Sequence, residues 1–393
     1  MKIIVYCQHV LGIGHFFRTL EICRQFKGHD VVLVTGGERP DIVLPDHVRE
    51  FPLPSLMMNA DFSQFYTTEI GKSIDAVKIE RQDRLMQIFK ELSPDVFLIE
   101  LYPFGRNAFR FELDPILESI REEELSACLV ICSLRDVLVE KRKAESYEAR
   151  VIKKLNTYFD AVLVHSDPQL LKLDTTFSRL NDIDCPIIYT GFVTPRPAAG
   201  SGRMLRRQLG IQSHQKVVVA SAGGGKVGIE VLTAVAKAVP RVSADVVAYI
   251  FSGPFMDKDD FLRLKIFENS NLRVDRFTPD FLTYLDAADL SVSMAGYNTS
   301  MNLMAVGTPA LVWPFAQNRE QRLRAERLAR LGGLKVLADV DLEPNRLAGI
   351  MQSMMSQGKR PEGLIDLAGA EFTAQWIMEQ VRSEGAEGEL IGD

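Results

Sequence analysis

The sequence predicts an α/β protein built from two doubly wound domains, each with a parallel sheet. Short apolar runs alternate with longer stretches of helical periodicity along most of the 393 residues. That alternation is typical of parallel strands covered by helices on both faces. It is interrupted at residues 194–202, which are rich in proline, glycine and serine, and then begins again. We therefore expect a first domain at 1–193, a second at 203–365, and a terminal segment at 366–393.

The composition is that of an ordinary globular protein. Hydrophobic residues make up 46% and charged residues 25% of the chain, enough for well-packed cores. The net charge of −6 gives no reason to expect nucleic-acid binding, which usually shows a basic domain. The five cysteines are scattered, which favours buried, reduced thiols in a cytoplasmic protein. No cluster has metal-ligand spacing, so we predict neither a metal nor a cofactor.

The sequence shows no membrane-spanning segment, because no apolar run approaches the roughly 20 residues that a transmembrane helix needs. The first residues are typical of a strand and lack the features of a cleavable signal peptide.

The first domain opens with a buried strand and a glycine turn. Residues 3–7 are apolar, Gly12 and Gly14 follow, and His15 stands at the start of a predicted helix. Phe17 occupies the place of the third glycine in a dinucleotide-binding fingerprint, so we do not predict NAD binding. Further elements of this domain are predicted as a helix at 16–26 and strands at 31–34, 96–100, 127–132, 161–165 and 187–190.

His15 is the candidate general base, since a neutral imidazole can accept a proton from a hydroxyl near pH 7. A carboxylate would orient the ring. Glu100 ends one predicted strand and Asp136 follows the next, and strand ends of this kind converge on one crevice. Glu100 is the first choice. The alternative for all three is an ordinary polar residue in a loop.

The second domain begins with a strand at 217–221 and a loop that contains Gly223, Gly224, Gly225 and Lys226. The loop lacks the first glycine and the Ser or Thr that a Walker A loop needs, so a P-loop NTPase is excluded. Consecutive glycines can still expose main-chain N–H groups to a diphosphate, and Lys226 adds a charge. A plain tight turn is the alternative. The later elements are predicted as strands at 246–251, 290–294 and 310–313 and helices at 228–239, 281–288, 319–331 and 372–381.

A glycine turn and a helix follow the predicted strand 290–294. Gly296 permits backbone angles closed to other residues and a close approach by a ligand. Asn298, Thr299 and Ser300 are residue types that cap a helix start, where N–H groups and the helix dipole suit a phosphate. The loop at 314–321 then carries side chains suited to a hydroxyl-rich ligand. These are Gln317, Asn318, Glu320 and Gln321. An ordinary βαβ unit with a polar surface loop is the alternative.

This stretch resembles the donor-binding segment of nucleotide-sugar glycosyltransferases of the two-domain GT-B fold. It is most similar to the MurG-like family (glycosyltransferase family 28) and, more distantly, to the UDP-glycosyltransferases. In those families a Gly-x-Asn/Leu-Ser/Thr turn holds the diphosphate, and Gly296, Asn298 and Thr299 match it. An Asp/Glu-Gln pair holds the sugar, matched by Glu320-Gln321. The acidic ribose-binding residue of the family aligns with Asn302, an amide.

The resemblance implies two Rossmann-like domains that face each other across a cleft, with the last helix crossing back to the first domain. The first domain would bind the acceptor, and the second would bind a nucleotide sugar. The expected donor is a UDP-sugar, with a dTDP-sugar as the second choice. Phe277 and Tyr297 would belong to the donor site. Transfer would be inverting and metal-independent, to a small-molecule or lipid-linked acceptor. A sugar-nucleotide epimerase or hydrolase and a non-catalytic nucleotide-binding protein stay open.

Residues 53–66 form an irregular apolar segment. It is either an acceptor or peripheral-membrane surface, or a loop packed on its own domain.

Overall fold

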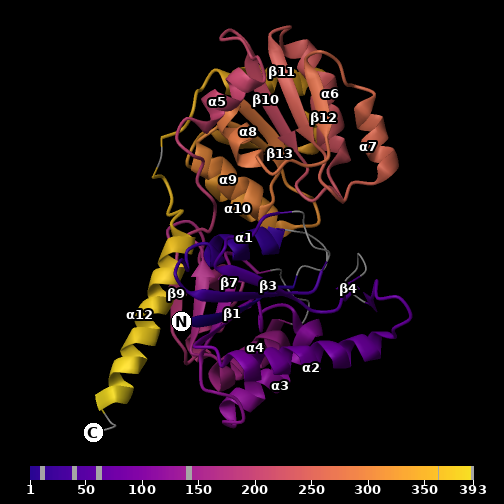
Figure 1. Cartoon of the computed structure of the whole chain (residues 1–393). Helices are drawn as coiled ribbons and strands as arrows, with labels where there is room; N and C mark the ends of the chain where they lie inside the picture. The colour runs from indigo at the N-terminus through magenta and orange to yellow at the C-terminus, as the bar shows by residue number, and fades with distance from the viewer. Residues whose placement is uncertain (9–13, 38–41, 59–63, 139–143, 362, 391–393) are drawn as a thin grey trace. The chain divides into compact units, whose positions relative to one another are not determined.

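The structure, a computed structural model, describes residues 1–8, 14–37, 42–58, 64–138, 144–361 and 363–390. The chain divides into two compact units, unit 1 (Met1–Val193 with Ala368–Asp393) and unit 2 (Thr194–Leu367). Each unit has its own parallel sheet with helices around it (Figure 1). The predicted α/β class with two doubly wound sheets is therefore confirmed.

Unit 1 has a seven-stranded parallel sheet in the order β3-β2-β1-β6-β7-β8-β9. The strands are β1 (Lys2–Tyr6), β2 (Asp30–Thr35), β3 (Val48–Pro52), β6 (Val96–Glu100), β7 (Leu129–Arg135), β8 (Ala161–His165) and β9 (Ile187–Tyr189). A separate antiparallel pair is formed by β4 (Met57–Met58) and β5 (Phe65–Tyr66). The strand order reverses between β1 and β6. In open α/β sheets such a switch point is where ligands bind, beyond the carboxyl ends of the strands.

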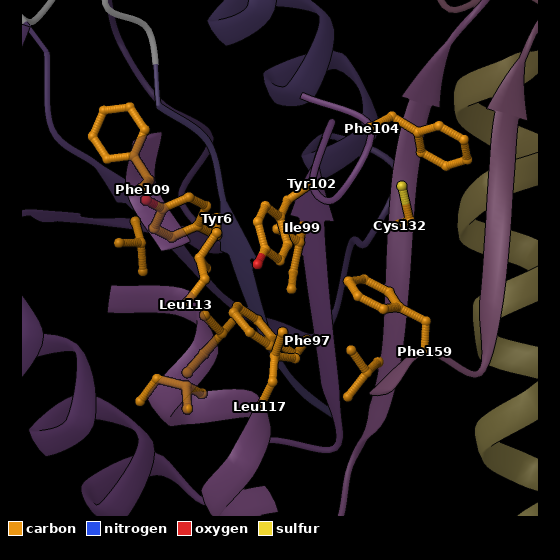
Figure 2. Close-up of a cluster of buried hydrophobic side chains, with 14 of the residues drawn as sticks. Tyr6, Phe97, Ile99, Tyr102, Phe104, Phe109, Leu113, Leu117, Cys132 and Phe159 are labelled. Carbon is orange, nitrogen blue, oxygen red and sulfur yellow. The ribbon is translucent and has the colours of Figure 1, made fainter. Parts of the chain in front are cut away.

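The helices of unit 1 cover the two faces of this sheet. They are α1 (Gly14–Cys23), α2 (Ile74–Leu92), α3 (Arg110–Arg121), α4 (Ala144–Tyr158) and α12 (Gly369–Leu390). Because strand side chains alternate between faces, Ile3 and Val5 pack with residues of α1 and α12, whereas Ile4 and Tyr6 pack with residues of α2, α3 and α4. Figure 2 shows part of the second core, in which Tyr6 and Phe97 lie close to Leu113. Helix α12 packs against α1.

A buried ion pair ties α2 to α3 beneath β1. Arg81 donates to both carboxylate oxygens of Glu112, from Nε at 2.7 Å and from Nη2 at 2.6 Å. Arg81 also donates to Gln8, and the Tyr6 hydroxyl donates to Glu112. Both charged side chains are fully buried. Each charge thus has the paired, hydrogen-bonded surroundings that a buried ion needs.

Unit 2 has a six-stranded parallel sheet in the order β12-β11-β10-β13-β14-β15, which reverses between β10 and β13. Its strands are β10 (Lys216–Ser221), β11 (Val246–Phe251), β12 (Leu272–Asp275), β13 (Leu290–Met294), β14 (Ala310–Trp313) and β15 (Leu334–Val336). Its helices are α5 (Ser201–Gln208), α6 (Ile229–Val242), α7 (Lys258–Lys265), α8 (Phe281–Ala287), α9 (Tyr297–Val306), α10 (Arg319–Ala329) and α11 (Pro344–Met355). The two units therefore share one strand order around the switch point.

Several elements differ from the sequence prediction. The strands β3 and β12 were missed because they combine buried with exposed side chains and so give no continuous apolar run. The strand predicted at 127–132 lies at 129–135, because Ser133 and Arg135 interrupt the apolar run on which the prediction was based. Of the apolar segment at 53–66, Leu53, Leu56 and Met58 belong to the unit 1 core, while residues 59–63 lie outside the described part of the chain.

Among the residues that the structure describes, no helix has both the length and the apolar character needed to cross a membrane. All five cysteines are free thiols, and Cys7, Cys23 and Cys132 are buried.

Replacing Arg81 with methionine should strongly destabilise unit 1, because the Glu112 carboxylate would stay buried without its bidentate partner. Loss of one partner of a buried pair costs about 3–5 kcal/mol. The chain has two tryptophans, so urea unfolding followed by Trp376 in a Trp313→Phe background reports unit 1. Arg84→Met removes a half-buried cation from the same helix and should cost under about 1 kcal/mol. Equal losses in the two variants would contradict the importance of the buried pair.

Candidate functional site

The switch point of unit 1 brings His15 and Glu100 together. His15 lies in the first turn of α1, directly after Gly14, and Glu100 is the last residue of β6. Nδ1 of His15 is 2.6 Å from Oε1 of Glu100. The other glycine of the predicted turn, Gly12, lies outside the described residues. Two of the residues selected from sequence are therefore hydrogen-bonded neighbours, although 85 positions separate them.

The contact with Glu100 determines which nitrogen of His15 carries the proton. An unprotonated Nδ1 at 2.6 Å from a carboxylate oxygen would place two lone pairs against each other. The contact of Nδ1 with Nη2 of Arg18 is longer, at 3.2 Å, so we assign the proton to Nδ1, which donates to Glu100. The lone pair of the neutral ring then lies on Nε2. The pKa of the ring is lowered to about 4. Burial contributes most to this decrease and the charges of Arg106 and Arg18 add to it, and together they outweigh Glu100, which raises the pKa. His15 is thus neutral at pH 7, with 24% of its side chain exposed.

Glu100 is ionised in this environment. Burial alone would raise the pKa of its carboxyl group, but His15, Arg18 and Arg106 together hold that pKa well below the usual range. Arg18, one turn after His15 on α1, donates from Nη2 to Oε1 of Glu100. Nε of Arg106 lies 3.6 Å from Oε2. The carboxylate therefore remains an ionised acceptor at neutral and mildly acidic pH.

Asp136 has different surroundings. It lies one residue after β7, is fully buried, and accepts the main-chain N–H of Val137 at Oδ1. The carboxylate in contact with His15 is Glu100.

In unit 2, helix α9 begins at the switch point, and its N-cap residue makes no side-chain cap. Gly296 is the N-cap residue, and α9 runs from Tyr297. The expectation that Asn298, Thr299 or Ser300 caps the helix is wrong, because all three lie inside its first turn. The expectation of special backbone angles at Gly296 is also wrong, since its φ of −65° and ψ of 155° are open to any residue. A side chain added at Gly296 would meet nothing within 4 Å.

Asn302 lies on α9 and is half buried. Its Oδ1 accepts a hydrogen bond of 2.8 Å from the Thr194 hydroxyl, so its amide nitrogen is the group that can face a ligand. Tyr297, in contrast, is buried with the guanidinium of Arg324 5.4 Å from its ring centre.

The glycine loop after β10 is shaped by a close approach of a second glycine turn. Gly223 and Gly225 have positive φ values of 65° and 89°. A Cβ added at Gly253, which follows β11 with φ +90°, would lie 2.5 Å from the Gly223 oxygen and from the Gly225 nitrogen. Inside the loop, the N–H of Gly223 donates to Ser221 and the oxygen of Gly224 accepts from Phe255. The expectation of freely exposed glycine N–H groups is thus wrong for Gly223.

Other predicted donor residues lie at the same carboxyl edge of the unit 2 sheet. Lys226 is exposed, with Nζ 6.0 Å from the centre of the Phe255 ring. Phe277 follows β12 and is 42% exposed. After β14, Oε1 of Gln321 accepts the main-chain N–H of Phe315 and so closes the loop on itself. Three further residues lie around the start of α10: Gln317 is exposed, and Asn318 and Glu320 are half buried.

Sequence reasoning missed three residues of these sites. Arg18 could have been found, because it follows His15 by three positions and so shares its helix face. Gly253 had a weaker signal as a glycine directly after a buried strand. Arg106 gave no signal in the sequence, because only the fold of the loop after β6 brings it close to Glu100. Within the described ranges, no group of three or more His, Cys, Asp or Glu side chains is placed to hold a metal ion.

A family model, the glycosyltransferase family 28 C-terminal domain, matches residues 224–380. A relative in Rhizobium meliloti (strain 1021) is the UDP-N-acetylglucosamine--N-acetylmuramyl-(pentapeptide) pyrophosphoryl-undecaprenol N-acetylglucosamine transferase, 33% identical over 105 residues. That match covers 26% of this chain and 27% of the relative. The chain thus spans about a quarter of the length of this curated relative.

Two solved structures resemble the chain over nearly its whole length. The calicheamicin glycosyltransferase CalG4 covers 98% of this chain and 95% of its own, with a TM-score of 0.58 and 15% identity. The match with MurG of Acinetobacter baumannii covers 96% of this chain and 100% of the MurG chain, with a TM-score of 0.56 and 13% identity. At such identities the likeness shows the fold alone, which is the GT-B fold. With the family match, it confirms the predicted resemblance to MurG-like and UDP-glycosyltransferase proteins.

Gly253→Ala should distort the glycine loop, because the new methyl group would overlap the backbone of Gly223 and Gly225. A matched control is Gly210→Ala, where φ is +69° but nothing lies within 4 Å. Left-handed backbone alone costs about 1–2 kcal/mol, and overpacking adds about 1–3 kcal/mol. Urea unfolding followed by Trp313 in a Trp376→Phe background should therefore show the larger loss for Gly253→Ala. An equal decrease in the free energy of unfolding in both variants would mean that the glycine loop accommodates the added methyl group without an energetic penalty.

Proposed function

We propose that this chain, a GT-B protein with a glycosyltransferase family 28 C-terminal domain at residues 224–380, is an inverting glycosyltransferase. It moves a sugar from a nucleotide diphosphate sugar to a hydroxyl of an acceptor. The observation that carries this proposal is the contact between Nδ1 of His15 and Oε1 of Glu100 at the switch point of unit 1. It leaves Nε2 unprotonated on a partly exposed ring, as a general base requires.

In the proposed reaction Nε2 of His15 takes the proton of the acceptor hydroxyl. The acceptor oxygen forms a bond to the anomeric carbon of the donor sugar. The bond from that carbon to the diphosphate oxygen breaks, and its electron pair leaves on the diphosphate. Glu100 holds the imidazole in place and stabilises the imidazolium that forms. Attack opposite the leaving group inverts the anomeric carbon.

Unit 2 is the proposed donor-binding unit. The uncapped start of α9 at Gly296, with Asn298 and Thr299 in its first turn, would hold the diphosphate through main-chain N–H groups and the helix dipole. Lys226 and the glycine loop would add charge and N–H groups, so that the leaving diphosphate is stabilised without a metal ion. The side chains of the 314–321 loop would bind sugar hydroxyls. They are Gln317, Asn318, Glu320 and Gln321.

Asn302 bears on the choice of nucleotide. A carboxylate at this position could accept hydrogen bonds from both ribose hydroxyls, whereas an amide whose oxygen is bound to Thr194 can only donate. We propose a uridine diphosphate sugar first, because the curated relative uses one, and a thymidine diphosphate sugar second. The family relative also suggests a lipid-linked acceptor at unit 1, which a cytoplasmic protein in peripheral contact with a membrane could reach.

An epimerase or hydrolase on the same fold is not favoured, since the relatives are named as transferases. Product analysis distinguishes them, because those enzymes change the nucleotide sugar without an acceptor.

Gly296→Val should weaken binding of nucleoside diphosphates while leaving unit 2 folded. The backbone angles of Gly296 permit valine, and a Cβ added there would meet no protein atom within 4 Å, so we expect the side chain to obstruct the ligand and not the fold. Calorimetric titration with UDP and with dTDP should show a loss of at least about tenfold in affinity. Gly349→Ala, which also adds a carbon into open space, should bind like the native protein. Undiminished affinity of Gly296→Val for both nucleotides would remove this turn from the donor site.

His15→Ala should lower turnover by about 10²–10⁴ without changing donor affinity, because the proton acceptor is lost and the donor site is not. In the native protein the rate should fall as the pH drops through about 4, where Nε2 becomes protonated, and not near the ordinary histidine value of 6.5. A pH–kcat/KM profile measures this. His214→Ala, at an exposed histidine, serves as the control. An active His15→Ala variant with the native profile would exclude His15 as the base, and Glu100 and Asp136 would be the next candidates.

A further inference from the structure

The carboxylate of Glu100 lies between two guanidinium groups. Arg18 donates to Oε1, the oxygen that also meets His15, and Nε of Arg106 lies 3.6 Å from Oε2. The side chains of Glu100, Arg18 and Arg106 are only 1%, 3% and 9% exposed. Two positive charges therefore surround one negative charge in a largely buried cluster beside a neutral imidazole.

Arg106 has Glu100 as a charge partner, but its Nε and Nη2 atoms gain no hydrogen bond in return for their burial. Its Nε and Nη2 atoms are buried without a hydrogen-bond partner, and so is Oε2 of Glu100. The separation of 3.6 Å is too long for a hydrogen bond, so Arg106 acts on Glu100 through charge alone. Buried N–H groups without a partner are costly, and an ordinary structural arginine would be expected to reach a partner or solvent.

The loop after β6 prevents Arg106 from leaving this position. Tyr102 and Phe104 of this loop are buried in the core of unit 1 (Figure 2), and the Tyr147 hydroxyl donates to the Phe104 oxygen at 2.6 Å. Leu101 and Arg106 itself have positive φ values of 67° and 55°. Such conformations cost roughly 1–3 kcal/mol each and persist only where the surrounding fold imposes them.

The charge of Arg106 opposes the effect of Glu100 on His15. A carboxylate in contact with an imidazole favours the imidazolium form, which by itself would raise the pKa of the ring. Arg106 and Arg18 both act in the opposite direction. The nearby Cys7 and His165 stay neutral, because burial raises the pKa of the thiol to about 12 and lowers that of the second histidine to about 3.

We infer that Arg106 is a positioning residue of the proposed reaction: with Arg18 it keeps Glu100 ionised and bound to Nδ1–H of His15, while preventing the imidazole from becoming charged. The inference rests on the proposed function, since it assigns Arg106 to the base of that reaction. Its consequence is a base that stays available well into the acidic range. A histidine paired with a carboxylate alone would be protonated at higher pH.

The test is an NMR titration of His15 in protein labelled at the Cε1 carbon of histidine, with the His15→Gln spectrum used to assign the signal. In Arg106→Gln the pKa of His15 should rise above its value of about 4, while burial of the ring still keeps it below 6.5. Arg106→Lys keeps the charge and should titrate like the native protein. Arg24→Gln removes a 43% exposed charge directly after α1, the helix that carries His15, and should also leave the titration unchanged.

Arg106→Asn provides a second neutral variant, because asparagine tolerates positive φ better than other residues with a side chain. A folded neutral variant in which His15 titrates as in the native protein would overturn the inference. So would an Arg106→Lys variant with the same shift as Arg106→Gln.

The pH–rate profile separates this inference from the proposed function. With both correct, the acid limb of the Arg106→Gln profile moves to higher pH together with the NMR titration. If the titration moves and the rate profile does not, the effect of Arg106 on His15 stands, and the assignment of His15 as the base fails.

Discussion

The site of unit 1 depends on one buried carboxylate, that of Glu100. Parallel pairing of β1 with β6 aligns Tyr6 with Ile99, so Glu100 lies beside the residue that follows β1. The same chain segment then leads into α1, which carries His15 and Arg18. Glu100 binds both and lies 3.6 Å from Nε of Arg106, so its removal would leave two largely buried guanidinium groups without this carboxylate. A charge whose partner is removed is much more costly than the pair itself, so the arrangement is held as a unit.

In the proposed reaction the two units use the same sheet order for different chemistry. In each, the order reverses between two central strands whose carboxyl ends lie at one edge. In unit 1 this edge presents a neutral histidine oriented by a carboxylate. In unit 2 it presents the uncapped start of α9 and a glycine loop held by Gly253. One edge is suited to accept a proton and the other to receive a diphosphate, which are the two needs of glycosyl transfer from a nucleotide sugar.

Buried charges serve two distinct purposes in unit 1. Arg81 and Glu112 satisfy each other with two hydrogen bonds, and their place between α2, α3 and β1 is that of a structural pair. Arg106 differs, since its buried Nε and Nη2 atoms make no hydrogen bond and its backbone is held at positive φ. Unsatisfied polar atoms and strained backbone are typical of functional sites, where stability is lower than the fold would otherwise allow.

The sequence by itself determined the α/β class, the strands with continuous apolar runs and the candidates His15, Glu100 and Gly296. These features depend on local periodicity and on the rule that parallel strands end at one edge. The tertiary structure alone decided that Glu100, rather than Asp136, meets His15. It also decided that Asn302 binds Thr194, that Gly253 supports the glycine loop and that Arg106 reaches Glu100. Each of these is a contact between segments distant in the chain, and such contacts follow from packing and burial, which no local pattern encodes.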